Sequence, residues 1–224
     1  NSGGHKDAST TQFAIAGLAA VRAVYVDNGD VTRLGQLDTI TANAKASYFA
    51  NGRPGNDGVN GILHASELGH GYNHPDTNSL HQSSAGIWIQ LAGGGDLHDA
   101  GVQGYLRWLY NRYNYQTISN ADGGWWPSYF YFMWVSAKAL SFLEDSGLTP
   151  NAGEIGPDDL GTLPAASAPA FAGRLEHLVP GAVDRPPSFG SELAPYYASA
   201  FELPRWYFDY SYELLTRQDS AGFF

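Results

Sequence analysis

Cysteine is absent from the 224-residue sequence, and methionine occurs only once. Without cysteine the chain has no disulfide, no thiolate ligand for zinc and no cysteine nucleophile. The absence leaves the compartment open, because a chain without thiols tolerates oxidising and reducing surroundings alike. Since the sequence opens at Asn1 rather than at a methionine, we expect a trimmed, secreted or periplasmic protein, with the cytoplasm as the alternative.

Positive charge is also scarce, with 12 Lys and Arg against 22 Asp and Glu, a net charge of −10. This balance predicts no nucleic-acid partner and no anionic membrane surface, because both need a basic footprint. Long hydrophobic runs are missing too, since Arg22 and Lys138 interrupt the two most apolar stretches. No membrane span is therefore expected. The hydrophobic share of 43% and the aromatic share of 14% indicate an acidic globular protein.

Two kinds of helical segment alternate along the chain. Segments 12–26, 83–92 and 128–143 are apolar on nearly every face, which predicts buried inner helices. Segments 32–49 and 99–115 are apolar on one face only, which predicts outer helices with one face in solvent. No stretch shows a convincing period of two, so the pattern favours an all-α fold. Such alternation is typical of a two-layer helical ring, with an irregular helical bundle as the alternative.

A proline-rich segment follows the last of these helices. Eight of the 12 prolines lie between Pro150 and Pro195, mixed with Ala, Gly and Ser. We expect a long irregular loop over 149–195, a length typical of functional covers or loose linkers. The rest of the chain predicts one domain over 1–224, with this loop inserted.

Three pieces of the sequence share a repeat pattern. They are an aromatic helix end, YLRWLYNRYNYQTISNADGGWW at 105–126, a shorter copy, YELLTRQDSAGFF at 212–224, and the helix openings STTQFAIAGL at 9–18 and SLHQSSAGIW at 79–88. Together they resemble the α/α toroid superfamily of terpenoid cyclases and protein prenyltransferases, with squalene-cyclase-like repeats. The resemblance implies an α/α toroid of inner and outer helices, either a closed barrel or an open crescent, with a ligand pocket for terpenoid or prenyl compounds.

The resemblance also implies that the ring is incomplete. The family closes its ring with five or six helix pairs, whereas this chain offers three or four and ends inside a repeat motif. A further chain or subunit that completes the helical ring is therefore a predicted partner. An uncovered inner wall would otherwise form a large apolar binding surface.

The catalytic motifs of that superfamily do not match. Cyclases that protonate an alkene carry an acid-rich motif, and only Asp158 and Asp159 approach it. The prenyltransferase zinc site requires a cysteine, so no cofactor is expected. Terpenoid or prenyl chemistry is thus implied by resemblance alone, because a fold can be inherited without its activity. The alternatives are a carbohydrate-processing α/α-barrel enzyme, a lyase or a hydrolase, and a non-catalytic binding or interaction module.

Histidines and carboxylates are dense between 64 and 82. The spacing matches no usual metal signature, so a polar loop is favoured and no tightly bound zinc is expected. If a metal did bind here, His70, His74 and His81 would be its first ligands.

The predicted functional surface lies where the inner helices start. Inner helices of a ring point their N-termini to one end, where polar caps and a partial positive dipole collect. Aromatic faces there stabilise carbocations and also stack on sugars, so the ligand is predicted to be a small apolar molecule or a glycan. Candidates for catalysis are His81, Tyr129 and Asp122. The residues predicted to bind the ligand are Gln12, His81, Gln82, Trp126, Tyr129 and Tyr131.

Overall fold

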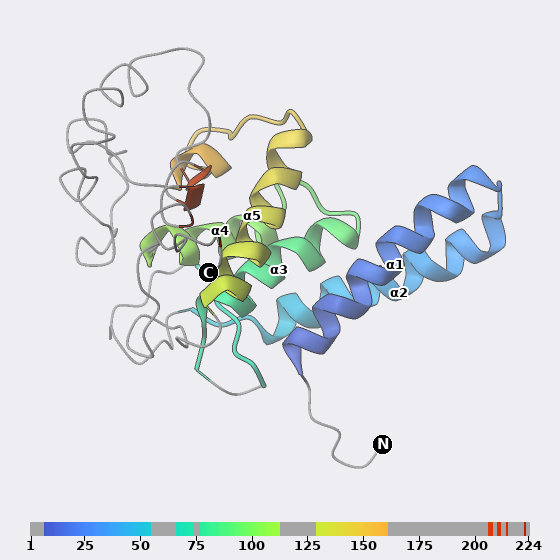
Figure 1. Ribbon diagram of the computed structural model, residues 1–224, viewed down its shortest axis with the longest axis horizontal. Helices are drawn as coiled ribbons and strands as arrows, with labels where there is room; N and C mark the ends of the chain where they lie inside the picture. The colour runs from blue at the N-terminus through green and yellow to red at the C-terminus, as the bar shows by residue number, and fades with distance from the viewer. Residues whose placement is uncertain are drawn as a thin grey trace.

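The computed structural model describes residues 7–54, 66–73, 77–112 and 129–160, together with residues 206, 207, 210, 211, 214 and 222. Figure 1 shows how the helices are arranged. They are α1 (Ala8–Asp27), α2 (Val31–Asn51), α3 (Leu80–Ala92), α4 (Ala100–Asn111), α5 (Tyr129–Asp145) and the short 3₁₀ helix η2 (Pro157–Asp159). The described residues form no strand, only isolated bridges. The all-α prediction is confirmed, and each of the five predicted segments contains a helix.

Side-chain caps fix the starts of three helices. Asp7 accepts a hydrogen bond from the Thr10 backbone N–H at 3.0 Å, and Asp30 accepts one from Arg33 at 3.0 Å. Ser79 caps α3 in the same way. Such caps satisfy backbone donors that have no partner within the helix. Capping residues therefore fix where α1, α2 and α3 begin.

Helix α3 is the centre of the fold. It packs against α1, α2, α4 and α5, and every residue from Leu80 to Gln90 is buried. Gly86 permits the close approach of α4, because a Cβ there would lie 2.7 Å from the Tyr105 ring. The Tyr105 hydroxyl in turn donates to the Tyr48 backbone oxygen of α2 at 2.9 Å. The prediction that 83–92 is buried is confirmed for residues 83–90, whereas Leu91 and Ala92 are half-buried.

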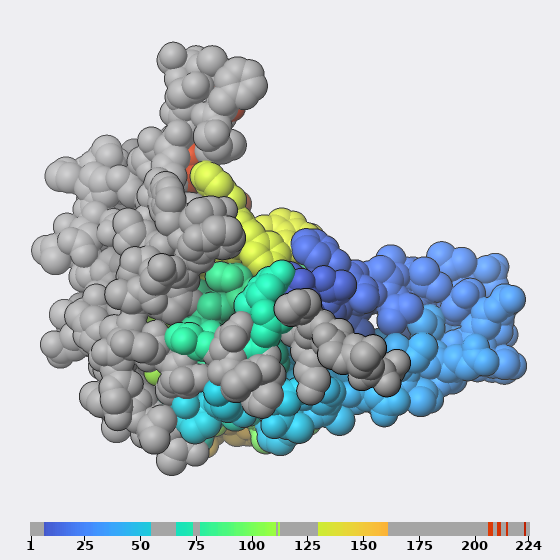
Figure 2. Space-filling view, turned by 90° about the horizontal axis from the view of Figure 1, so that it is seen from below, coloured from blue at the N-terminus to red at the C-terminus, as the bar shows by residue number. Residues whose placement is uncertain are grey.

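Helix α1 contradicts the prediction that 12–26 is buried. Only Ala8, Gln12 and Ile15 are buried, whereas Phe13 is 55% exposed and Val24 is 53% exposed. Figures 1 and 2 show the reason: the second half of α1 and the first half of α2 project together from the other described helices. We call these two helices the α1–α2 arm. Among the described helices, the second half of α1 thus has only α2 beside it, and its apolar side chains meet solvent.

Helix α4 deviates in the opposite direction. Gln103 was predicted to lie on a wet face, but it is 3% exposed. Its amide donates to the backbone oxygens of Leu97 and Ile155 at 2.8 and 2.9 Å, and accepts from the Ile155 N–H at 2.9 Å. Arg107 donates to the Gly153 backbone oxygen at 2.9 Å. Gln103 and Arg107 therefore bind the backbone of neighbouring segments, and the predicted solvent-facing position is wrong for Gln103. Residues 113–115 and the side chain of Asn111 lie outside the described residues.

Helix α5 is buried on one face only. Val135, Ala139, Leu140 and Leu143 belong to the core, whereas Phe130 is 46% exposed and Trp134 is 42% exposed. The inner assignment of 128–143 thus holds for half of the helix. How much of a helix is buried in this fold depends on how many other helices pack against it. The apolar pattern of a helix does not reveal that number.

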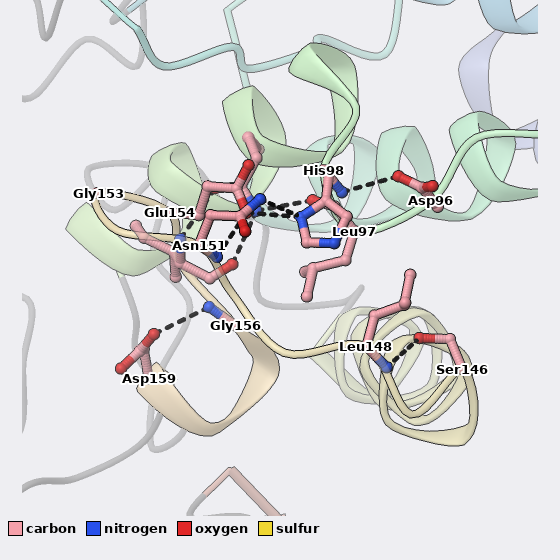
Figure 3. Close-up of polar contacts among 12 residues, drawn as sticks. Asp96, Leu97, His98, Ser146, Leu148, Asn151, Gly153, Glu154, Gly156 and Asp159 are labelled. Carbon is pink, nitrogen blue, oxygen red and sulfur yellow. Dashed lines mark hydrogen bonds and ion pairs between the residues drawn. The ribbon is translucent and has the colours of Figure 1, made fainter.

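The segment after α5 folds back along α4 (Figure 3). His98 Nδ1 lies 2.7 Å from Glu154 Oε2, and Asn151 contacts the same ring nitrogen at 2.9 Å. Asp159 accepts a hydrogen bond from the Gly156 N–H at 2.8 Å and so caps η2. The first part of the predicted irregular loop, up to residue 160, is thus an ordered turn with one 3₁₀ helix. Residues 161–195 of that prediction lie outside the described residues.

A buried ion pair ties the segment 66–73 to the end of α4. Arg112 donates to both Glu67 carboxylate oxygens, at 2.9 and 3.0 Å, and both side chains are fully buried. The guanidinium also lies 4.4 Å from the centre of the Trp108 ring. A bidentate pair in this environment fixes both partners, since removing either would take from the other buried charge the partner that it contacts through two hydrogen bonds.

Candidate functional site

The starts of α1, α3 and α5 meet at one place. Gln82 donates to the Ser9 hydroxyl at 3.3 Å, which joins α3 to α1. Tyr131 donates to the Gln12 side-chain oxygen, which joins α5 to α1. The rings of His81 and Tyr131 lie 5.6 Å apart. The structure thus brings together four of the six residues predicted to bind the ligand, and we call Gln12, His81, Gln82 and Tyr131 the helix-start cluster.

Two nitrogen atoms in this cluster have no hydrogen-bond partner. Gln12 is 1% exposed and His81 is 7% exposed. Within the described part of the chain, nothing hydrogen-bonds Gln12 Nε2 or His81 Nδ1. A buried polar atom without a partner costs free energy, so such atoms are rare in folded proteins. Both residues contact Tyr131, and the unpaired donors and acceptors therefore belong to one small region.

The side chains of this cluster are uncharged at neutral pH. Burial lowers the pKa of His81 to about 4, so its imidazole is neutral, with one ring nitrogen that donates a hydrogen bond and one that accepts. Burial also raises the pKa of Tyr131, which keeps the phenol protonated. The nearby Asp7 carboxylate is engaged by the Tyr72 hydroxyl at 2.6 Å and by the Thr10 N–H. The cluster therefore suits a neutral polar group of a ligand.

Aromatic rings flank the cluster on its exposed side. Phe13 stacks on Tyr131 at 6.1 Å and on Trp134 at 5.9 Å. Phe13 and Trp134 are both about half exposed, so their faces are available to an apolar ligand. Neither residue was predicted from the sequence. Their positions in the sequence could have indicated them, because Phe13 follows Gln12 directly and Trp134 lies one helical turn after Tyr131.

The structure does not describe the side chains of the other predicted site residues. Asp122 and Trp126 lie outside the described residues, and so does the side chain of Tyr129, although its backbone begins α5. Of the catalytic candidates, only the side chain of His81 is described. No carboxylate among the described residues hydrogen-bonds its ring. Among the described residues, His81 thus has no carboxylate that orients its ring as the partner of a catalytic base would.

The suggested metal ligands do not form a site within the described residues. His70 bonds the Gly71 backbone oxygen through Nδ1 at 2.7 Å, and its ring stacks on Tyr48 at 3.8 Å. His74 lies outside the described residues. Over the ranges that the structure describes, no three His, Asp or Glu side chains are close enough to hold a metal ion.

Comparisons with protein-family models, with curated proteins and with solved structures found no match for this chain. Across the described helices, none combines the length and apolarity that a membrane crossing requires. The function is therefore inferred from the geometry of the helix-start cluster and its flanking rings.

Proposed function

We propose that this protein binds a small, uncharged and largely apolar molecule at the joined starts of α1, α3 and α5. The observation that carries the proposal is the pair of buried, unpartnered nitrogens on Gln12 and His81. A ligand hydroxyl or carbonyl would satisfy both, while its apolar part would stack on the Phe13 and Trp134 rings. Binding would thus remove a free-energy cost that the protein carries without its ligand.

The class of ligand that we propose is an isoprenoid. The proposal is supported by the resemblance to terpenoid cyclases and prenyltransferases and by the common position of three helix starts, which an α/α toroid requires. We also propose the toroid-type arrangement itself, as an open crescent. The exposed valines Val21, Val24 and Val26 on α1 support a further chain or subunit that packs against the arm and extends the ring.

Binding without catalysis fits the cluster better than either enzyme alternative. Glycoside hydrolysis needs two carboxyl groups facing one another. The four side chains of the helix-start cluster are uncharged, and Asp122 lies outside the described residues. The carbohydrate alternative remains testable, because aromatic rings also stack on sugars.

The test uses one probe for each ligand class. Farnesol, an isoprenoid alcohol, and cellobiose, a neutral disaccharide, are titrated into the protein by calorimetry. We expect farnesol to bind and cellobiose not to bind. Gln12→Met and His81→Phe keep the side-chain volume roughly constant but remove the nitrogens. Each should weaken farnesol binding by about three- to tenfold, the usual worth of one hydrogen bond.

Helix α3, which carries His81, also offers a matched control. Gln90 is a buried glutamine of α3 whose amide bonds the Lys45 backbone oxygen at 3.0 Å, far from the cluster. Gln90→Met should leave farnesol affinity unchanged in the folded protein. Binding of cellobiose alone would favour the carbohydrate alternative. Equal losses in all three variants, or no binding of either probe, would contradict the proposed site.

A further inference from the structure

A cavity of about 490 Å³ lies between α5 and the described residues of 206–214, which are red in Figure 1. Its α5 wall includes Phe130 and Trp134, and its other wall includes Trp206, Tyr207 and Tyr210. The volume is typical of sites for small molecules, and five of the eleven lining residues are aromatic. Of the residues discussed above at the helix starts, only Trp134 also lines this cavity.

Hydrogen bonds hold the base of the cavity in place. Trp206 donates through Nε1 to the Glu144 carboxylate at 2.6 Å, and the Tyr210 hydroxyl lies 2.8 Å from the Ser136 hydroxyl. The Trp206 and Tyr210 rings contact each other edge-on at 5.5 Å, and both residues are buried. The base is therefore formed before any ligand arrives. This preorganisation lowers the entropic cost of binding.

The rim of the cavity is apolar and exposed. Phe130, Trp134 and Tyr207 are each between 42% and 47% exposed. Large aromatic side chains gain most from burial, because each covers a large apolar area. An apolar ligand would cover the rings that solvent now contacts.

One cation lines this aromatic cavity. Lys138 is the only charged residue of α5 before Glu144, and it makes no ion pair or hydrogen bond with any described residue. By contrast, Lys45 pairs with Asp99 at 2.8 Å. Glu144 accepts a hydrogen bond from Trp206 and lies six residues after Lys138, about 9 Å farther along the helix axis. The Lys138 ammonium is exposed, has no partner among the described residues and lies beside aromatic rings, so in a chain of net charge −10 it is available to an anionic group of a ligand.

We infer that this cavity is a second binding site, for an aromatic or aliphatic molecule that carries one anionic group. The apolar body lies between the Trp134 and Tyr207 rings, and the anionic group pairs with the Lys138 ammonium. The inference does not rest on the proposed function, because the helix-start cluster contributes no residue to this cavity.

The test uses two fluorescent probes with the same ring system. 1-Anilinonaphthalene-8-sulfonate carries an anionic group, and N-phenyl-1-naphthylamine lacks it. We expect Lys138→Met to weaken sulfonate binding about tenfold and to change binding of the neutral probe by less than twofold. Lys45→Met, which removes a lysine outside the cavity, should leave both affinities unchanged. An equal effect of Lys138→Met on both probes, or no effect on either, would overturn the inference.

A cavity-filling variant tests the location. Ser141 lines the cavity and is half-buried, so Ser141→Phe should occupy part of its volume. We expect both probes to lose at least tenfold in affinity, with the circular dichroism spectrum unchanged. Retained binding of both probes in this folded variant would place them elsewhere and overturn the inference. Gln12→Met and His81→Phe should leave sulfonate binding intact, which separates this site from the helix-start cluster.

Discussion

The α1–α2 arm and the α3–α4 pair are both antiparallel helix pairs, but they differ in burial. In the arm only six residues are buried, three on each helix. In the pair, α3 is buried from Leu80 to Gln90, and α4 is buried from Gly101 to Leu106. Both α1 and α3 are apolar on nearly every face. Among the described helices, α3 packs against four others, whereas the end of α1 packs against one, so burial is decided by how many neighbours a helix has.

The glycines of the two helix pairs also differ in how closely they are packed. A Cβ at Gly86 of α3 would meet the Tyr105 ring, and one at Gly101 of α4 would lie 2.4 Å from the Gln90 side-chain oxygen. At Gly17 of α1 and Gly35 of α2, a Cβ would meet nothing within 4 Å. The α3–α4 pair thus needs its glycines for close packing, whereas the arm does not.

The largest expected effect concerns ion pairs in the two regions. Glu67→Gln removes the negative charge that pairs with the buried Arg112 guanidinium, which should lower the free energy of unfolding by about 3–5 kcal/mol. The matched change in the arm is Asp38→Asn, whose partner Arg22 lies 2.9 Å away with both side chains about half exposed. That change should cost under about 1 kcal/mol. Urea denaturation measures both, and similar losses would mean that the arm is as well packed as the core.

Acid should destabilise the protein through His81. Its pKa is about 4 in the folded state and near 6.5 when unfolded, so the unfolded chain takes up the proton first. Stability from this group is complete above about pH 6.5 and is lost as pH falls towards 4. Between pH 7 and pH 5 the loss should be about 2 kcal/mol. In urea denaturation, His81→Phe should remove this part of the pH dependence; an unchanged pH profile would mean that the imidazole is not buried.

Alanine substitutions at two glycines should act in opposite directions. Gly86→Ala forces the Tyr105 ring away and should destabilise the protein by about 1–2 kcal/mol. Gly17→Ala meets open space and should stabilise α1 by about 0.5–1 kcal/mol. Thermal unfolding of both variants checks the sign. A stabilising Gly86→Ala would show that the α3–α4 contact can relax.

The smallest effect is expected at the exposed His98. The Glu154 carboxylate raises its pKa, and Asp96 adds to this in the same direction. The stabilisation from this contact is therefore fully present below pH 6.5 and is lost as pH rises through the pKa of His98 in the folded protein. This pH dependence is the reverse of that of His81. Glu154 has a lowered pKa, so the contact is also lost in stronger acid. A proton NMR titration should show a His98 midpoint above 6.5 that returns towards this value in Glu154→Gln. An unchanged midpoint would mean that the carboxylate does not contact the ring in solution.

Helix positions were predictable from the sequence because capping residues and apolar periodicity are local signals. The meeting of the α1, α3 and α5 starts was also anticipated, and it brought Gln12, His81, Gln82 and Tyr131 together. The exposure of Val24 was not predictable, since it depends on which helices are absent from its surroundings. The burial of Gln103 was not predicted, because a buried glutamine that bonds three backbone groups cannot be told from a solvent-exposed one in the sequence.

The aromatic cavity was missed for a similar reason. Lys138 was noticed only as an interruption of an apolar run, whereas its meaning depends on Trp206 and Tyr207, nearly 70 residues later. Long-range contacts of this kind leave no periodic pattern. The same holds for Phe13 and Trp134, whose stacking joins α1 to α5.

The most direct test of the helix-start site is the ¹⁵N NMR spectrum of His81 at pH 7, assigned with the His81→Phe variant and recorded with and without farnesol. We predict a neutral imidazole in both states and a clear shift of the Nδ1 resonance at saturation, because the ligand supplies the missing hydrogen bond. A charged imidazole without ligand, or an Nδ1 resonance that farnesol leaves unchanged, would contradict a ligand site at the starts of α1, α3 and α5.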